Sequence, residues 1–172
     1  WTSVMLALTS FFLSKFKLIR DHILNIKIFF ALFLSGFLIF INWGVWIYAV
    51  SNDQIINASF GYFIMPIISV FLGFFFFKEK LTFKGKISVL LVIISILFLI
   101  IVDFKTLPIV GIIVALSWSF YNLIRKKISV PTDIGLFIES LFLLPVVLIA
   151  FYFIAENNLN DFNITQPKLM FI

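Results

Sequence analysis

Apolar residues in this chain gather into long runs that are separated by short polar stretches. A helix needs about 20 consecutive apolar residues to cross the hydrocarbon core of a bilayer. By that measure the pattern predicts five complete membrane-spanning helices, at residues 28–50, 56–77, 87–102, 107–124 and 134–155. Shorter apolar runs at 1–14 and 169–172 predict a partial span at the front and the start of another at the end. We therefore expect an all-α, polytopic transmembrane helix bundle that is a fragment cut at both ends.

The composition supports this class of protein. Of the 172 residues, 63% are hydrophobic and 12% are charged, whereas soluble domains are about half apolar and about a quarter charged. The chain has no cysteine and one histidine, which excludes thiol chemistry and multi-histidine metal sites. Because the spans also supply no nucleophile–base pair, we expect no catalytic residue, no metal, no cofactor and no enzymatic activity.

The basic residues alternate from loop to loop. Eleven of the 13 lysines and arginines lie in three loops, at residues 15–27, 78–86 and 125–133, and two lie in the loops on the other side. Short loops rich in Lys and Arg stay in the cytoplasm, so the pattern predicts a multi-pass protein of the plasma (inner) membrane with these three loops cytoplasmic. The net charge of +5 is then a topology signal, with the lipid bilayer as partner and no nucleic acid.

One span combines an apolar composition with a small and polar face. Ser59, Tyr62, Pro66, Ser69 and Gly73 follow one another at spacings of three and four residues, which puts them on the same side of a helix. Such a face packs inside a bundle or lines a path. Pro66 removes a backbone hydrogen bond near the middle of the span, so we expect a kink there. Interrupted helices in transporters often border the binding site.

Glu139 is the only acidic residue well inside a predicted span. A carboxylate at bilayer depth costs about 2.5–3.5 kcal/mol on insertion scales, so it should face the bundle interior with a partner or become protonated. One interpretation is a substrate contact or a proton-coupling group. The other is that Glu139 lies close enough to the cytoplasmic end of its helix for the side chain to extend into the interface.

Asn42 and Trp46 lie four residues apart and share a face of the first complete span. An amide this deep in a span needs a hydrogen-bond partner, so Asn42 either contacts substrate or bonds a neighbouring helix. Trp46 belongs either to a ligand pocket or to the aromatic belt at the outer interface. Trp43 has the same ambiguity, and lipid or the core is the expected neighbour of its ring.

A second polar face runs along the span at 107–124. Gly111, Ala115, Trp118 and Asn122 follow one another at spacings of four, three and four residues. Gly111 and Ala115 form a small-xxx-small pair that lets two helix backbones approach closely, so packing is their expected role. Trp118 and Asn122 continue this face toward the cytoplasm, and solute binding and helix packing are equally good interpretations for both.

Several of these segments, in this order, resemble the RarD group of EamA-type transporters in the drug/metabolite transporter superfamily. The resemblance rests on Asn-Trp at 42–43, Trp-Ile-Tyr-Ala-Val at 46–50, Asn-Ala-Ser-Phe-Gly-Tyr-Phe-Ile-Met-Pro at 57–66, Leu-Gly at 72–73, Lys-Glu at 78–79 and the segments 117–127 and 135–145. It covers nearly the whole chain, and the Gly-Tyr-Phe-Ile-x-Pro element is its most specific part.

The resemblance implies a ten-helix protein built from two five-helix inverted repeats. Residues 1–102 would be the rest of the first repeat, from the middle of helix 2 to helix 5, and residues 103–172 the start of the second, with helices 6, 7 and the beginning of 8. Family helices 3 and 4 would correspond to 28–50 and 56–77 and help to line a central cavity. That assignment supports the solute-binding candidates on those two helices.

Two departures from the family pattern bear on this assignment. The family commonly has Asn before the proline, where this chain has Met65, so a polar contact is lost or moved. The usual Gly-Glu at the end of helix 4 reads Lys78-Glu79, which keeps the glutamate and loses the glycine turn.

Together these features predict a secondary transporter or permease that moves small organic metabolites or drugs across the inner membrane by alternating access. Its partners would be a small-molecule solute and the bilayer, with proton coupling through the intramembrane acid Glu139 as an additional role. The alternative is a non-transporting membrane assembly or sensor subunit. The candidate substrate-binding residues are Asn42, Trp46, Tyr62, Pro66, Trp118, Asn122 and Glu139.

Overall fold

The computed structural model describes residues 16–104 and 107–156, and within these ranges the chain is helical without a strand. Its elements are α2 (Phe16–Leu24), α3 (Ile26–Ser51), α4 (Ile55–Phe77), α5 (Phe83–Leu99), the π-helical turn η1 (Ile100–Phe104), α6 (Ile109–Lys127) and α7 (Thr132–Glu156). The five helices from α3 to α7 are long and apolar enough to cross a membrane, which confirms the five complete spans. The predicted partial spans at 1–14 and 169–172 lie outside the described residues.

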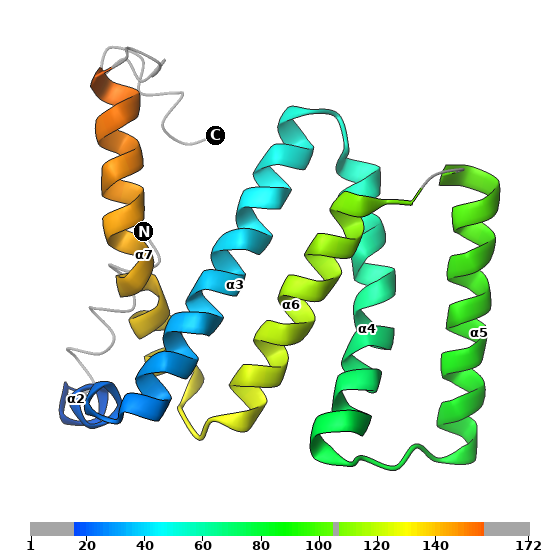
Figure 1. Ribbon diagram of the computed structural model, residues 1–172, viewed down its shortest axis with the longest axis horizontal. Coiled ribbons are helices and arrows are strands. Elements are labelled where there is room, and N and C mark those ends of the chain that lie inside the picture. The colour runs from blue at the N-terminus through cyan, green and yellow to red at the C-terminus, as the bar shows by residue number, and fades with distance from the viewer. Residues whose placement is uncertain (1–15, 105–106, 157–172) are drawn as a thin grey trace.

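The five long helices stand in a row, in an order that differs from their order in the chain. Figure 1 shows α6 between α3 and α4, with α7 beyond α3 and α5 beyond α4. Consequently α6, which the resemblance would place in the second repeat, packs against the two helices that it would place in the first. Helix α5 has no buried residue, and among the other long helices it packs mainly against α4.

Helix α2 corrects the prediction of a loop at 15–27. Its buried Ile19 packs with Leu32 of α3 and with Ile134 and Ile138 of α7, so this one residue anchors a short helix whose charged side chains are exposed. Asn25 then caps α3, because its side-chain oxygen accepts hydrogen bonds from the backbone N–H groups of the next turn, at 3.2 and 3.5 Å. The charges that indicated a loop belong to the exposed side of a surface helix.

The backbone at the end of α4 shows why the RarD-type pattern has glycine at the position of Lys78. Lys78 caps the helix with φ 54° and ψ 33°, a left-handed conformation that glycine adopts without a steric penalty. The carbonyl of Gly73 accepts hydrogen bonds from the N–H groups of Lys78 and Glu79, as at many helix ends. The turn that the resemblance associates with glycine is therefore kept, with lysine in the strained position.

Lys78→Gly is accordingly expected to stabilise the protein, by up to about 1 kcal/mol, because glycine removes the left-handed strain. Thermal unfolding in detergent, followed by circular dichroism, measures the change. Lys80→Gly is the matched control, since the described positive-φ residues other than glycine are Asp53 and Lys78. A lower melting temperature for Lys78→Gly than for the wild type would contradict the expectation.

Candidate functional site

Asn42 joins α3 to α6 in the interior of the bundle. Its side chain is 4% exposed, and its amide nitrogen donates to the carbonyl of Val114 at 3.0 Å and to the hydroxyl of Ser117 at 2.9 Å. Both N–H groups of the amide are used in this way, which confirms the predicted role of bonding a neighbouring helix. The amide oxygen is left as the polar atom that a solute could address.

A cavity of about 430 Å³ adjoins Asn42, and α3, α4 and α6 all contribute to its wall. The residues that line this aromatic cavity are Asn42, Trp43, Trp46, Tyr62 and Trp118. Four of the seven predicted solute-binding residues therefore meet around one cavity, although they come from three helices. The rings of Trp46 and Tyr62 lie 5.7 Å apart across the α3–α4 boundary, tilted by 31°. Solute binding by these residues stays a prediction.

The α4 and α6 backbones touch beside this cavity. A Cβ atom on Gly61 would lie 2.5 Å from the carbonyl oxygen of Gly111, and one on Gly111 would lie 3.0 Å from the nitrogen of Gly61. Gly111 and Ala115 are buried, which confirms their predicted packing role. Gly61 was missed, although small residues inside a membrane-spanning helix are typical of a close helix contact.

The predicted polar face of α4 straddles the edge of its contact with α6. Tyr62 and Pro66 are exposed, Ser69 is partly buried, and Gly73 is buried. The backbone of α4 is helical without interruption through Pro66. Pro66 lines none of the cavities described here, so its predicted contact with solute has no geometric support beyond its place one turn from Tyr62.

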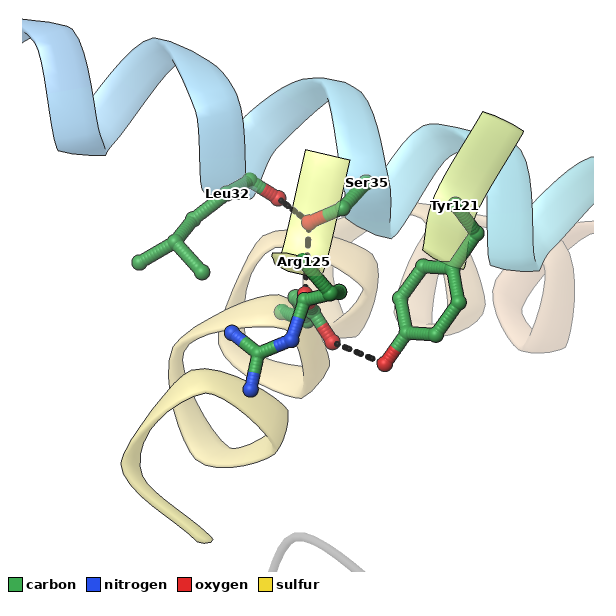
Figure 2. Close-up of polar contacts among 5 residues, drawn as sticks. Leu32, Ser35, Tyr121 and Arg125 are labelled. Carbon is green, nitrogen blue, oxygen red and sulfur yellow. Dashed lines mark hydrogen bonds and ion pairs between the residues drawn. The ribbon is translucent and has the colours of Figure 1, made fainter. Parts of the chain in front are cut away.

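Glu139 lies in a polar cluster between α3, α6 and α7, and its side chain is 2% exposed. Figure 2 shows the partners that converge on its carboxylate: Ser35 donates a hydrogen bond at 2.5 Å, Tyr121 donates one at 3.4 Å, and Nε of Arg125 lies 3.8 Å away. The carboxylate faces the bundle interior. The alternative that it extends into the cytoplasmic interface is therefore wrong.

Arg125 corrects a further expectation, since the sequence assigned it to a cytoplasmic loop. It occupies the last turn of α6, and its side chain is 11% exposed. Its guanidinium lies against the backbone of Gly135, where a Cβ atom would overlap it. The sequence does hold a signal for this cluster: Tyr121 and Arg125 are four residues apart on α6, as Gly135 and Glu139 are on α7.

The cluster opens onto a second cavity, of about 440 Å³, between α3, α6 and α7. Tyr121, Glu139 and Ser140 supply its polar lining, and most of its other lining residues are aliphatic. Trp43 and Trp118 line this cavity and the first one. The two indole side chains therefore form a shared wall between the aromatic cavity and the buried carboxylate.

Asn122 lies apart from both cavities, at a third one of about 130 Å³ between α4 and α6. Ser69 and Ser119 also line it, with their hydroxyl oxygens 3.4 Å apart. Ser119 donates to the carbonyl of Met65 at 3.3 Å. A backbone oxygen and two hydroxyls thus link α4 to α6 beside Met65, the residue that replaces the asparagine of the resemblance.

The charged groups of the site do not form a metal centre. Within residues 16–104 and 107–156, no three His, Asp or Glu side chains come close enough together to hold a metal ion. An exposed ion pair joins Lys126, in the last turn of α6, to Glu79, just after α4, and the ammonium of Lys126 lies 4.8 Å from the centre of the Phe77 ring. Such an exposed pair contributes little to stability.

Comparison with known proteins gives a consistent set of relatives. Residues 1–101 match the EamA-like transporter family. The chain is similar to the uncharacterized transporter YojE of Bacillus subtilis (35% identity, covering 86% of this chain and 50% of the relative). It is also similar to protein RarD of Escherichia coli K12 (39%, covering 75% and 43%) and to an uncharacterized transporter of Vibrio cholerae (32%, covering 98% and 56%). The chain spans about half the length of these curated relatives. No solved structure matches it.

Proposed function

Because the chain belongs to the EamA-like transporter family, we propose that the full-length protein is a secondary transporter that moves small organic solutes by alternating access. The chain is a multi-pass protein of the inner membrane. We further propose that residues 1–102 belong to one five-helix repeat and residues 103–172 begin a second, inverted one. On this proposal, α3 and α4 come from the first repeat and α6 and α7 from the second.

One observation carries the proposal: the aromatic cavity is formed at the contact between the two proposed repeats. Asn42, Trp46 and Tyr62 come from α3 and α4, whereas Trp118 comes from α6. Alternating access works by rocking one repeat against the other around a fixed site near the middle of the membrane. A cavity with walls from both repeats would change its shape in such a movement, and a cavity within one repeat would not.

The polar cluster around Glu139 supports a role in coupling proton exchange to helix movement. Glu139 on α7 is held by Ser35 on α3 and by Tyr121 and Arg125 on α6, so the charge on one carboxylate ties three helices together. Protonation would remove that charge and release Arg125. We infer that proton exchange at Glu139 is linked to the relative movement of these helices, through the wall that Trp43 and Trp118 share.

Efflux from proteoliposomes containing the full-length protein tests the proposal. The vesicles are loaded with a defined mixture of amino acids, nucleosides and sugars, and mass spectrometry follows the efflux. Tyr62→Ala is expected to lower the rate for the transported solute by about tenfold, the effect of losing about 1.4 kcal/mol of binding. Glu139→Gln is expected to abolish the response to an imposed pH gradient.

Tyr48→Ala is the matched control, because Tyr48 is also an exposed tyrosine in a membrane-spanning helix and lines none of the cavities described here. Its efflux rate should equal that of the wild type. Unchanged rates and an unchanged pH response in both Tyr62→Ala and Glu139→Gln would refute the assigned residues. Absence of any protein-dependent efflux would favour the alternative of a non-transporting assembly or sensor subunit.

A further inference from the structure

Three of the chain's four tryptophans line a single cavity. These are Trp43, Trp46 and Trp118, and Tyr62 adds a fourth aromatic ring; the remaining tryptophan, Trp1, lies outside the described residues. Tryptophans gather at membrane interfaces as an aromatic belt. Trp118, however, is the middle residue of the 19-residue helix α6, half a span from either interface. The belt therefore does not explain this group of rings.

The polar groups at the cavity are few, and they are of two kinds. Asn42 donates both N–H groups to α6, so its amide offers a solute an oxygen acceptor. The indole nitrogen of Trp46 is buried without a hydrogen-bond partner, a condition that it shares with one guanidinium nitrogen of Arg125 among the described side chains. A buried donor without a partner is costly, and a turn of the Trp46 ring toward the cavity would let a solute accept a hydrogen bond from it and remove that cost.

The cavity has no charged side chain in its lining. The nearest buried acid in the fold, Glu139, opens onto the neighbouring cavity and already has Arg125 as its counter-charge. Aromatic faces attract cations, but a cation would enter this cavity without a free carboxylate to offset its desolvation. The lining therefore favours a neutral ligand.

From these features we propose that the cavity binds a neutral, flat aromatic ring system that carries a hydrogen-bond acceptor. The volume of about 430 Å³ lies within the range of about 300–1,000 Å³ that is typical of small-molecule sites. Stacked or edge-to-face ring pairs strengthen binding beyond the burial of area alone. This inference rests on the proposed transport function, because it names the class of solute that the same site takes.

Equilibrium binding of three probes to the full-length protein in lipid nanodiscs tests the inference, with binding to empty nanodiscs subtracted. Coumarin is flat, neutral and carries a lactone acceptor. Octahydrocoumarin has the same skeleton without aromatic rings, and N-methylquinolinium is a flat cation of similar size. Coumarin is expected to bind about tenfold more tightly than either of the other probes, which corresponds to about 1.4 kcal/mol.

Variants locate the binding site. Trp118→Leu is expected to weaken coumarin binding by about tenfold, whereas Trp118→Phe, which keeps an aromatic ring, should retain most of it. Tyr48→Leu, at a tyrosine that lines none of the three cavities at the site, should bind coumarin as the wild type does. Equal affinity for coumarin and octahydrocoumarin, or tighter binding of N-methylquinolinium, would overturn the inference.

The two proposals can fail separately. Efflux of non-aromatic solutes through a protein that does not bind coumarin would overturn the aromatic site and leave transport standing. Coumarin binding that is lost in Trp118→Leu, together with no protein-dependent efflux of coumarin or of the solute mixture, would support the aromatic site and overturn transport. Circular dichroism and gel filtration of each variant distinguish a lost site from a lost fold.

Discussion

Replacing Arg125 with methionine is expected to lower the free energy of unfolding by about 3–5 kcal/mol, the cost of leaving one partner of a buried ion pair alone. Glu139 is 2% exposed and the Arg125 side chain 11%, so water does not replace the missing cation. Methionine keeps the length and apolar volume of the arginine stem, which limits the change to the charge and its hydrogen bonds. Reversible unfolding in mixed micelles, followed by circular dichroism, measures the loss.

The neighbouring residue provides a control within the same helical turn. Lys126 pairs with Glu79, but both side chains are more than half exposed, so Lys126→Met should cost no more than about 1 kcal/mol. The double variant Arg125→Met with Glu139→Gln should recover most of the loss, because no uncompensated charge is then buried. Equal losses in Arg125→Met and Lys126→Met, or no recovery in the double variant, would refute the buried ion pair.

The membrane-spanning helices could be predicted because their length and apolar composition are local properties of the sequence. All five predicted complete spans correspond to helices of the structure. Helix α2 was missed because it is short and carries three charged residues among its nine. Its buried contact depends on Ile19 meeting residues of α3 and α7. A helix that is held by distant neighbours gives little signal in its own residues.

Within the candidate site too, residues with a local sequence signal were predicted, and a residue placed by tertiary contacts was not. Helical periodicity identified Asn42, Trp46, Tyr62 and Trp118, because each lies on a polar or small-residue face of an otherwise apolar helix. The structure brings them to one cavity. Periodicity did not find Arg125, because a count of loop charges treats every basic residue near a helix end as solvated. Tertiary contacts turn the Arg125 side chain toward the bundle interior, because Gly135 on α7 leaves space for its guanidinium.

The close contact of α4 with α6 also depends on one side chain being absent. Gly111→Ala is expected to destabilise the protein by about 1–3 kcal/mol, the usual cost of overpacking a close contact. The added Cβ atom would overlap the carbonyl oxygen of Asn57 and lie 3.0 Å from the nitrogen of Gly61. Neither atom belongs to a flexible side chain, so the helices themselves must separate. The same unfolding measurement in mixed micelles records the effect.

Gly44→Ala is the matched control, because it makes the same substitution inside a membrane-spanning helix. A Cβ atom at Gly44 meets no atom within 4 Å, so the higher helix propensity of alanine should leave stability unchanged or raise it by up to about 1 kcal/mol. Separation of α4 from α6 would also move Tyr62 away from Trp118 across the aromatic cavity. Gly111→Ala should therefore weaken coumarin binding as well as folding. Stability equal to that of Gly44→Ala would show that the two helices do not approach through their glycines.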